Sequence, residues 1–279
     1  MKDREKVLRT EETRKSEQEQ RKRAPLYVIA GAPGVGKTEL LALITTSLGI
    51  SPVEERFVEN RDLLNFYTSG HPEEYSFKAQ MNFLGVTTEQ TRGFREPLAS
   101  RCVVQDQGME GNMVVADTQH KLGYMTDIEF SMYTEAFNFI VGAPSFPKPD
   151  IYVALTAKYE IIKQRIIDRG REMELQMMHS HPDYFPSLVE NFDNWLREKA
   201  RRAPVIVIDT GEVDICKEDE REFSVKEICD WSTYYLTSPI QLGGKSQDGA
   251  SFIFPDFVLH PRLFSRSRSY SIDRQKKQL

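Results

Sequence analysis

LYVIAGAPGVGKTELLALITTSLG, residues 26–49, contains the arrangement that decides the fold. LYVIA is a short apolar run typical of a buried strand, and GAPGVGKT follows it at residues 31–38. TELLALITTSLG (38–49) then has the apolar period of a helix and ends at a glycine. A strand, a glycine-rich turn and a helix in this order form a cradle for phosphate groups, because backbone N–H groups and the helix N-terminus converge on one point.

The residues of this turn have distinct expected roles. Its phosphate-binding positions are Gly31, Ala32, Pro33, Gly34, Val35, Gly36, Lys37 and Thr38. The glycines allow the backbone to close around an anion, Lys37 is expected to reach the outer phosphates, and Thr38 is expected to hold Mg²⁺. The sequence therefore predicts that the chain binds a nucleoside triphosphate.

The rest of the chain repeats the alternation of strand and helix. CVVQD (102–106), DIYVALT (150–156) and PVIVID (204–209) are apolar runs that are expected to form buried strands. Helical patterns occupy the segments around 73–92, 126–142, 157–170 and 184–203, while residues 107–112 are polar, interrupted by glycine and without an apolar face. Uniformly apolar strands that alternate with helices predict an α/β fold with three layers, in which helices flank a central parallel sheet of about five strands.

Composition sets limits on domain organisation and partners. The 279 residues divide into a charged arm (1–24), a main domain (25–240) and an extension with a basic tail (241–279). The formal net charge of −5 argues against nucleic-acid binding, and no apolar run approaches the roughly 18 residues that a membrane helix requires. The three cysteines lack pairing or metal-ligand spacing, and residues 1–24 lack the apolar segment of a signal peptide. We therefore expect a cytoplasmic protein with no membrane or nucleic-acid partner.

Four groups of polar residues are expected at the carboxyl edge of the sheet, where α/β proteins bind their ligands. They are the carboxylates of VEERFVEN (53–60), Gln80 within FKAQMNFL, Asp106 after CVVQ, and the arginines of RIIDRGREME (165–174). Each group has a purely structural explanation when taken singly, since Arg165 and Arg169, for example, are four residues apart and fit a solvated helix face. Together they supply what phosphoryl transfer requires, namely a base, Mg²⁺ ligands and cations.

These motifs resemble those of the deoxynucleoside kinases, especially the bacterial deoxyadenosine/deoxyguanosine kinase branch, from about residue 25 to about residue 210. EERFVENRDLLNFY (54–67) is similar to the family's Glu-Pro-Val and Asn-Pro-x-Leu-x-x-Phe-Tyr elements, with Glu55 at the position of the general base. FKAQMNFL (77–84) is similar to its Phe-x-x-Gln-x-x-Phe-Leu pattern, and RIIDRGREME is similar to its phosphate lid.

The resemblance implies a P-loop NTPase fold with a lid, a homodimer, and ATP-dependent phosphorylation of the 5′-hydroxyl of a deoxyribonucleoside in nucleotide salvage. Glu55 would take the hydroxyl proton, Lys37 would hold the β- and γ-phosphates, and Mg²⁺ would be positioned by Thr38 and Asp106. The lid residues that would neutralise the transferring phosphoryl group are Arg165, Arg169 and Arg171. The residues that would contact the nucleoside are Tyr67, Gln80, Gln107, Asn112 and Glu174.

The chain departs from the family pattern at two places. Where the family has Asp/Glu-Arg-Ser, this chain has Asp106-Gln107-Gly108, so a neutral amide replaces a cation near the 5′-hydroxyl and the reacting phosphates. An arginine that the family often has seven residues after the glutamine is Thr87 here, and an aspartate four residues after the serine is Asn112. Asparagine both donates and accepts hydrogen bonds whereas aspartate only accepts them, so a changed base preference is expected.

Two other functions remain compatible with the sequence. One is phosphorylation of a different small acceptor such as a nucleoside monophosphate, which the missing arginine at position 107 leaves open. The other is a non-catalytic nucleotide-binding subunit built on the same fold. The presence together of Lys37, Thr38, Glu55 and the three lid arginines argues against a site that has lost its catalytic function.

Overall fold

A five-stranded parallel sheet forms the centre of the molecule. The structure is a computed structural model that describes residues 23–48, 52–53, 60–217, 225 and 228. The strand order is β2-β3-β1-β4-β5, and every neighbouring pair is parallel. Four strands have four to six residues and β2 has two; they are β1 (Leu26–Ala30), β2 (Pro52–Val53), β3 (Val103–Asp106), β4 (Ile151–Thr156) and β5 (Val205–Asp209). The predicted parallel α/β sheet is confirmed.

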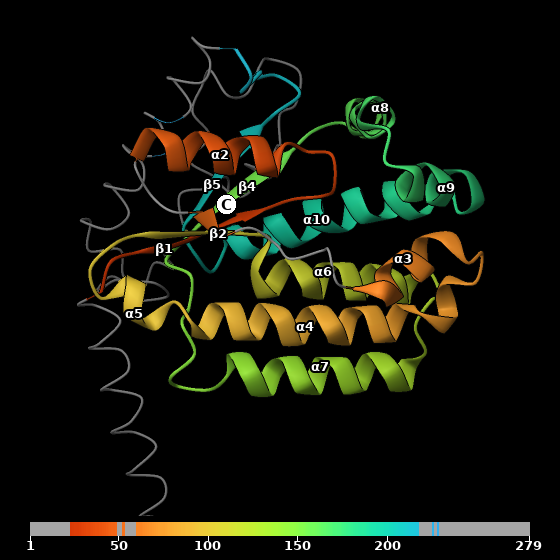
Figure 1. Cartoon of the computed structure of the whole chain (residues 1–279), viewed down its shortest axis with the longest axis horizontal. Helices are drawn as coiled ribbons and strands as arrows, with labels where there is room; N and C mark the ends of the chain where they lie inside the picture. Colours follow the sequence, from red (N-terminus) through yellow and green to blue (C-terminus); the bar gives the residue numbers. More distant parts are fainter. Residues whose placement is uncertain (1–22, 49–51, 54–59, 218–224, 226–227, 229–279) are drawn as a thin grey trace, which may run out of the picture.

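Helices cover both faces of this sheet (Figure 1). One face carries α2 (Lys37–Leu48), and the other carries α6 (Gly108–Lys121) and α10 (Tyr184–Ala200). Beyond α6 lie α4 (Ser76–Arg92) and α7 (Asp127–Val141), which pack on α6 and on each other. The remaining helical segments are α3 (Arg61–Thr68), η1 (Pro72–Glu74), α5 (Arg95–Leu98), α8 (Tyr159–Arg169) and α9 (Glu172–Ser180).

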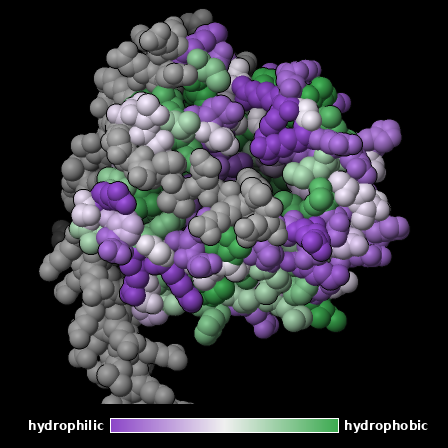
Figure 2. Space-filling model, in the orientation of Figure 1, coloured by the Kyte–Doolittle hydropathy of each residue, from purple (hydrophilic) through white to green (hydrophobic). Residues whose placement is uncertain are grey.

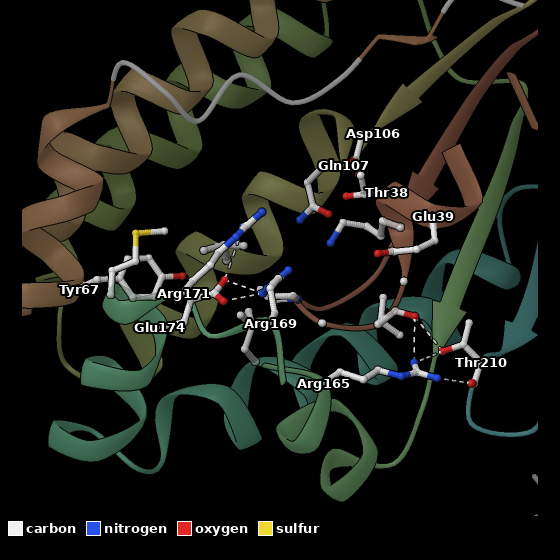
Figure 3. Close-up of a pocket in the computed structure, with 18 of the residues that line it drawn as sticks. Thr38, Glu39, Tyr67, Asp106, Gln107, Arg165, Arg169, Arg171, Glu174 and Thr210 are labelled. Atoms are coloured by element: carbon white, nitrogen blue, oxygen red, sulfur yellow. Dashed lines mark hydrogen bonds and ion pairs between the residues drawn. The ribbon is translucent and has the colours of Figure 1, made fainter. Parts of the chain in front are cut away.

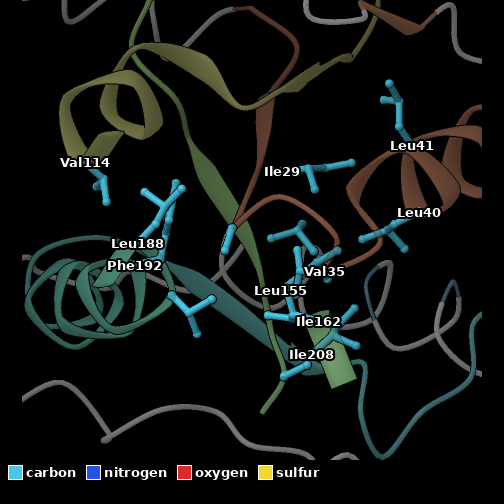
Figure 4. Packing of buried hydrophobic residues seen from close by; sticks show 14 of the residues in the cluster. Ile29, Val35, Leu40, Leu41, Val114, Leu155, Ile162, Leu188, Phe192 and Ile208 are labelled. Atoms are coloured by element: carbon cyan, nitrogen blue, oxygen red, sulfur yellow. The ribbon is translucent and has the colours of Figure 1, made fainter. Parts of the chain in front are cut away.

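The core lies on both faces of the sheet, which explains why the strand sequences are uniformly apolar. Every residue of β3 and β4 is buried. Figure 4 shows Ile29, Leu155 and Ile208, from three different strands, within the main hydrophobic cluster. Leu40 of α2 and Phe192 of α10 belong to the same cluster, so helices on the two faces share one core. A strand that is covered on both faces has no solvent side and therefore no alternation of polar and apolar residues.

The strand order places a crevice at the carboxyl edge beside β1. The chain runs from β1 to β2 and β3 on one side of β1, and then crosses to β4 on the other side. Such a reversal of direction opens a space between the loops that leave adjacent strands. The register pairs Ile29 of β1 with Asp106 of β3, so the end of β3 lies beside the start of the 31–38 loop.

The segment after Asp106 differs from the expectation. The sequence indicated a polar stretch without an apolar face, but residues Gly108–Lys121 form α6, in which Met109, Val114 and Ala116 are buried. Tertiary packing on β1, α4, α7 and α10 stabilises this helix despite its two glycines. Gly108 is required for close approach, because its φ is +64° and an added Cβ would lie 2.9 Å from Val28 Cγ1.

The charged arm (1–24) and the C-terminal extension (241–279) predicted from the sequence lie almost entirely outside the described residues. Residues 1–22 and 229–279 lie there, and so do residues 218–224, 226 and 227. Arg23 and Ala24, the last residues of the predicted arm, contact the main domain: Arg23 Nη1 is 2.8 Å from Asp150 Oδ2, and Ala24 N donates to Leu98 O at 2.8 Å. None of the helices within the described ranges combines the length and apolarity needed to cross a bilayer.

Candidate active site

A cavity of about 400 Å³ opens at the carboxyl edge of the sheet and brings most of the predicted site residues together. Those that line it are Pro33, Gly34, Val35, Gly36, Lys37, Thr38, Tyr67, Gln80, Asp106, Gln107, Asn112, Arg165, Arg169, Arg171 and Glu174. Gly31 and Ala32 belong to the same loop, but they are buried behind the cavity wall. Glu55 lies outside the described residues.

The 31–38 loop has the conformation that its glycines allow. Gly34 has φ +80° and Gly36 has φ +104°, in the region that favours glycine. A Cβ on Gly34 would also lie 2.9 Å from Ile166 Cγ1 of α8. Lys37 Nζ donates hydrogen bonds to Gly31 O at 2.9 Å and to Ala32 O at 3.3 Å, so its ammonium group lies across the loop.

Two oxygen ligands suited to Mg²⁺ lie beside this loop. Thr38 is the second residue of α2, and Asp106 is the last residue of β3 and is 7% exposed. Figure 3 shows their side chains in the same part of the cavity, next to Gln107. Mg²⁺ prefers oxygen donors and commonly takes one or two protein ligands, with phosphate and water completing the shell. The pair fits that need, and among the described residues no cluster of three or more His, Cys, Asp or Glu forms a metal site.

Two lid arginines converge on Glu174. Arg169, the last residue of α8, places Nη2 2.6 Å from both carboxylate oxygens of Glu174. Arg171 Nη1 is 3.8 Å from Glu174 Oε1. Gly170 separates the arginines in the left-handed conformation, which ends α8 and turns the chain into α9. The Glu174 side chain is only 4% exposed, whereas those of Arg169 and Arg171 are 33% and 49% exposed, so a buried carboxylate meets two partly exposed cations (Figure 3).

Arg165 makes different contacts from the other two arginines. Its Nη1 donates to Thr210 Oγ1 at 2.9 Å and its Nη2 donates to Thr210 O at 2.6 Å. Thr210 Oγ1 in turn donates to Val35 O in the phosphate loop at 2.8 Å. Arg165 therefore ties α8 and the residue after β5 to the loop, and Figure 3 shows it apart from the Arg169–Glu174 pair.

The part of the cavity formed by α4 and α6 carries side-chain amides. Gln80 of α4 is 1% exposed, and its amide has no hydrogen-bond partner among the described residues. Asn112 of α6 is 3% exposed, and its Nδ2 donates to Thr87 Oγ1 of α4 at 2.8 Å. Thr87 and Asn112, which were both singled out from the sequence as departures from the resembled pattern, are therefore in direct contact with each other.

Gln107 lies between this region and the phosphate loop. It has φ 66° and ψ −57°, precedes α6 and is 5% exposed. Its side chain packs over Gly111, where an added Cβ would lie 2.7 Å from Gln107 Cδ. No group within the described part of the chain donates a hydrogen bond to Gln107 Oε1, which is buried.

Several residues that line the cavity were not predicted from the sequence, among them Gln119, Tyr184 and Thr210. Gln119 accepts from Ser76 Oγ at 2.7 Å and donates to the Tyr184 hydroxyl at 3.4 Å. Burial raises the pKa of Tyr184 to about 12, so this hydroxyl stays protonated. Gln119 lies inside α6, which the sequence did not predict, and Tyr184 lies at the start of the helical pattern of 184–203, so neither carried a local signal. Thr210 directly follows an apolar strand, and the rule that ligands bind at the carboxyl ends of strands would have found it.

Comparisons with known proteins agree with this geometry. The deoxynucleoside kinase family profile matches residues 27–231. Deoxyadenosine/deoxycytidine kinase of Bacillus subtilis (strain 168) is 30% identical over 206 residues, covering 74% of this chain and 90% of the relative. Deoxyguanosine kinase of Lactobacillus acidophilus is 28% identical over 210 residues, with coverage of 74% and 90%. The structure of deoxyadenosine kinase from M. mycoides with bound dATP has a TM-score of 0.63 at 20% identity, covering 74% of this chain and 99% of the other, which shows a shared fold.

Proposed function

This chain belongs to the deoxynucleoside kinase family and is a nucleoside-phosphorylating enzyme, and we propose that it transfers the γ-phosphoryl group of ATP to the 5′-hydroxyl of a deoxyribonucleoside. The proposal rests on one observation: the phosphate loop (31–38) and the buried amides of Gln80 and Asn112 line the same cavity. Gly34, Gly36 and Lys37 suit a triphosphate, whereas Gln80 and Asn112 suit the edge of a nucleobase. The two relatives are named as kinases of deoxyadenosine and deoxycytidine and of deoxyguanosine. We propose an acceptor of the same class, a deoxyribonucleoside, for this chain.

The donor phosphates are held by the loop and Lys37. Lys37 Nζ now donates to two loop carbonyls, and it exchanges these neutral acceptors for charged phosphate oxygens when ATP binds. Thr38 and Asp106 would hold Mg²⁺, which supplies positive charge to the β- and γ-phosphates. Arg169 and Arg171 stabilise the charge that spreads over the transferring group, because both already converge at the cavity.

The acceptor is positioned by residues from three helices. Tyr67 of α3 and Glu174 of α9 are proposed to bind the sugar 3′-hydroxyl, since both side chains line the cavity beside the lid. Gln80 is proposed to bind the base. Gln107 has a buried amide oxygen next to Thr38 and is proposed to contact the region of the 5′-hydroxyl.

Glu55 is proposed as the general base that takes the 5′-hydroxyl proton. Its support is the similarity of residues 54–67 to the family's Glu-Pro-Val and Asn-Pro-x-Leu-x-x-Phe-Tyr elements. Asn60, within the same motif, caps α3 by accepting from Leu63 N at 3.0 Å, and it donates to Ala79 O at 3.1 Å. This anchors the chain just after residue 59 against α4.

We also propose that the enzyme is a homodimer that acts in nucleotide salvage in the cytoplasm. Ile128, Met132 and Phe139 of α7 are 75%, 55% and 83% exposed, and their spacing puts them on one side of the helix. Figure 2 shows hydrophobic residues along the lower edge of this face, where α7 lies in Figure 1. A second copy is the proposed cover for this surface. Neither Cys102 nor Cys216 forms a disulfide bond within the described residues, which suits a reducing compartment.

The decisive experiment measures ATP consumption and deoxynucleotide formation with a panel of deoxynucleosides and nucleoside monophosphates. The purified enzyme is expected to phosphorylate at least one deoxynucleoside. Lys37→Ala is expected to abolish measurable turnover because the donor phosphates lose their cation, and Glu55→Gln should lower kcat by about 10²-fold or more because the base is lost while the shape is kept. Phosphorylation of nucleoside monophosphates alone, or full activity in Glu55→Gln, would contradict the proposal.

A further inference from the structure

Another cavity, of about 310 Å³, lies on the face of the sheet that α6 and α10 cover (Figure 1). It is lined by Leu26, the first residue of β1, and by Tyr152, the second residue of β4, so it lies toward the amino ends of these strands. The candidate active site lies at the carboxyl edge, and none of the described residues lines both cavities. Small-molecule sites typically have volumes of about 300–1,000 Å³, so this second cavity suits a ligand of about one or two rings.

The walls of the second cavity carry several rings. These belong to Phe146, Pro147, Pro149 and Tyr152. Phe146 is 6% exposed and Tyr152 is 2% exposed, so both side chains are held in the core. Aromatic rings pack favourably against the faces and edges of other aromatic rings. These walls therefore favour a planar aromatic molecule over an aliphatic chain.

One pair of opposite charges forms a polar part of the same wall. Lys199 Nζ is 2.6 Å from Glu110 Oε1 and 4.4 Å from the centroid of the Tyr152 ring. The two charges neutralise each other, so the pair does not require a charged ligand. The other carboxylate oxygen, Glu110 Oε2, is buried and has no hydrogen-bond partner among the described residues. A buried acceptor without a donor is unfavourable, so a ligand that donates a hydrogen bond to this oxygen would be stabilised.

The first turn of α6 holds Glu110 at this wall. Gly108, the first residue of α6, packs so closely on β1 that an added Cβ would lie 2.9 Å from Val28 Cγ1. Met109 follows it and is 7% exposed, and both Val28 and Met109 line the second cavity. The backbone that carries Glu110 is therefore fixed before a ligand arrives, and a preorganised site has less conformational freedom to lose on binding.

We propose that the second cavity is a binding site for a small, planar, uncharged molecule with an N–H donor, and that Glu110 accepts a hydrogen bond from this donor. Indoles and other uncharged N–H heterocycles belong to this class. The proposal does not depend on the proposed phosphoryl transfer, because the two cavities share no lining residue within the described part of the chain. It places a small-molecule site beside Gln105 and Met109, which flank the turn that carries Asp106 and Gln107 of the active site.

Indole and benzofuran are the probes, because they have nearly the same shape and benzofuran has an oxygen atom in place of the N–H group. Calorimetric titration of the full chain is expected to give a Kd of about 0.1 mM for indole and a Kd about tenfold higher for benzofuran, which leaves Glu110 Oε2 without a donor. An excess of ATP or of a deoxynucleoside should not displace indole. Absence of indole binding, equal affinities for the two probes, or displacement of indole by either substrate would overturn the proposal.

The variant Glu110→Gln tests the hydrogen bond. The amide oxygen is expected to remain with Lys199 Nζ, so the amide nitrogen replaces Oε2 and a donor replaces the acceptor. The preference for indole over benzofuran should then be lost. A Glu110→Gln variant that keeps the tenfold preference would show that Glu110 does not bind the N–H group.

The variant Ala203→Leu tests the location. Ala203 lines the second cavity, and the larger side chain fills part of it, so both probes should bind at least about tenfold more weakly. Ala200→Leu is the matched control, because Ala200 is the last residue of α10, is also half-buried and does not line the cavity. It should leave both affinities unchanged. Circular dichroism checks that each variant is folded, and a folded Ala203→Leu variant with wild-type affinities would place the probes elsewhere and overturn the proposal.

Discussion

Gln107 adopts a backbone conformation that residues other than glycine seldom use. Its φ of 66° and ψ of −57° lie where a side chain meets steric strain, and such strain is found most often at functional sites. The side chain folds over Gly111, one turn into α6, and its oxygen is buried at the cavity. The absence of a side chain at position 111 is therefore what gives Gln107 its place.

We predict that Gly111→Ala destabilises the protein although alanine is the better helix former. A Cβ there would lie 2.7 Å from Gln107 Cδ, so the variant should lose about 1–3 kcal/mol in the free energy of unfolding through overpacking. Gly85→Ala is the control, because Gly85 is also inside a helix and has no atom within 4 Å of an added Cβ. It should gain about 1 kcal/mol.

Chemical denaturation of both variants measures the difference. The double variant Gly111→Ala/Gln107→Ala should recover most of the lost stability, because it removes the atoms that clash. If Gly111→Ala proves as stable as Gly85→Ala, the packing of Gln107 over Gly111 does not constrain the site.

At the scale of elements, the phosphate loop is held from behind by α8 and by the end of β5. Arg165 reaches Thr210 from α8, and Thr210 reaches the carbonyl of Val35. Arg165 Nη1 also lies 3.4 Å from Val35 O. These bonds fix the carbonyl at the middle of the loop, and thereby the direction in which the neighbouring N–H groups point.

Arg165→Ala and Thr210→Val are predicted to raise the KM for ATP by similar factors, of about tenfold, because each breaks the same connection to the loop. Changes in one hydrogen-bond network are not additive. The double variant should therefore be little worse than either single variant in a steady-state titration of ATP. Fully additive effects would mean that Arg165 acts on the phosphates independently of Thr210.

The sequence predicted the strands well and the helices unevenly, for a physical reason. Strands buried on both faces must be apolar throughout, so 26–30, 102–106, 150–156 and 204–209 stood out against their surroundings. α6 and α9 did not, because polar residues and glycines in them are accommodated by packing against other helices. The phosphate-loop motif and the family resemblance together predicted 15 of the residues that line the cavity. They did not predict the Arg165–Thr210 or Asn112–Thr87 contacts, which join residues on separate elements.

At the scale of the whole molecule, buried tyrosines make stability sensitive to alkaline pH. Burial raises the pKa of Tyr133 and of Tyr152, and raises that of Tyr184 to about 12. An unfolded tyrosine ionises near pH 10, so the unfolded state loses protons that the folded state keeps. The contribution of Tyr184, about 3 kcal/mol, is fully present below pH 10 and is lost as the pH rises through 12.

We predict that the free energy of unfolding, measured in urea, falls steeply above about pH 10. In Tyr184→Phe the slope of this free energy against pH should correspond to about one proton fewer released on unfolding. Tyrosinate absorbance should rise together with the loss of circular dichroism. Tyr159→Phe, which changes a less buried tyrosine, should have a smaller effect. A Tyr184→Phe variant with the wild-type pH dependence would show that this hydroxyl ionises in the folded protein.

The apolar surface of α7 carries a prediction about assembly. Ile128→Lys/Phe139→Lys should convert the proposed dimer to a monomer in sedimentation equilibrium, because charges would be buried without partners. Leu64→Lys changes an apolar residue of α3 that is 50% exposed, and it should leave the assembly unchanged. A dimer that persists in the double α7 variant would place the interface elsewhere.

Glu174 gives the enzyme a way to make its two substrates depend on each other. When donor phosphates draw Arg169 away, the Glu174 carboxylate loses its nearest cation although its side chain is only 4% exposed. The hydroxyl of the acceptor is the group that we propose then donates a hydrogen bond to this carboxylate. The donor then raises the affinity for the acceptor, and by thermodynamic reciprocity the acceptor raises the affinity for the donor by the same factor. Such positive cooperativity would favour ATP binding when a nucleoside is present, and so limit phosphoryl transfer to water.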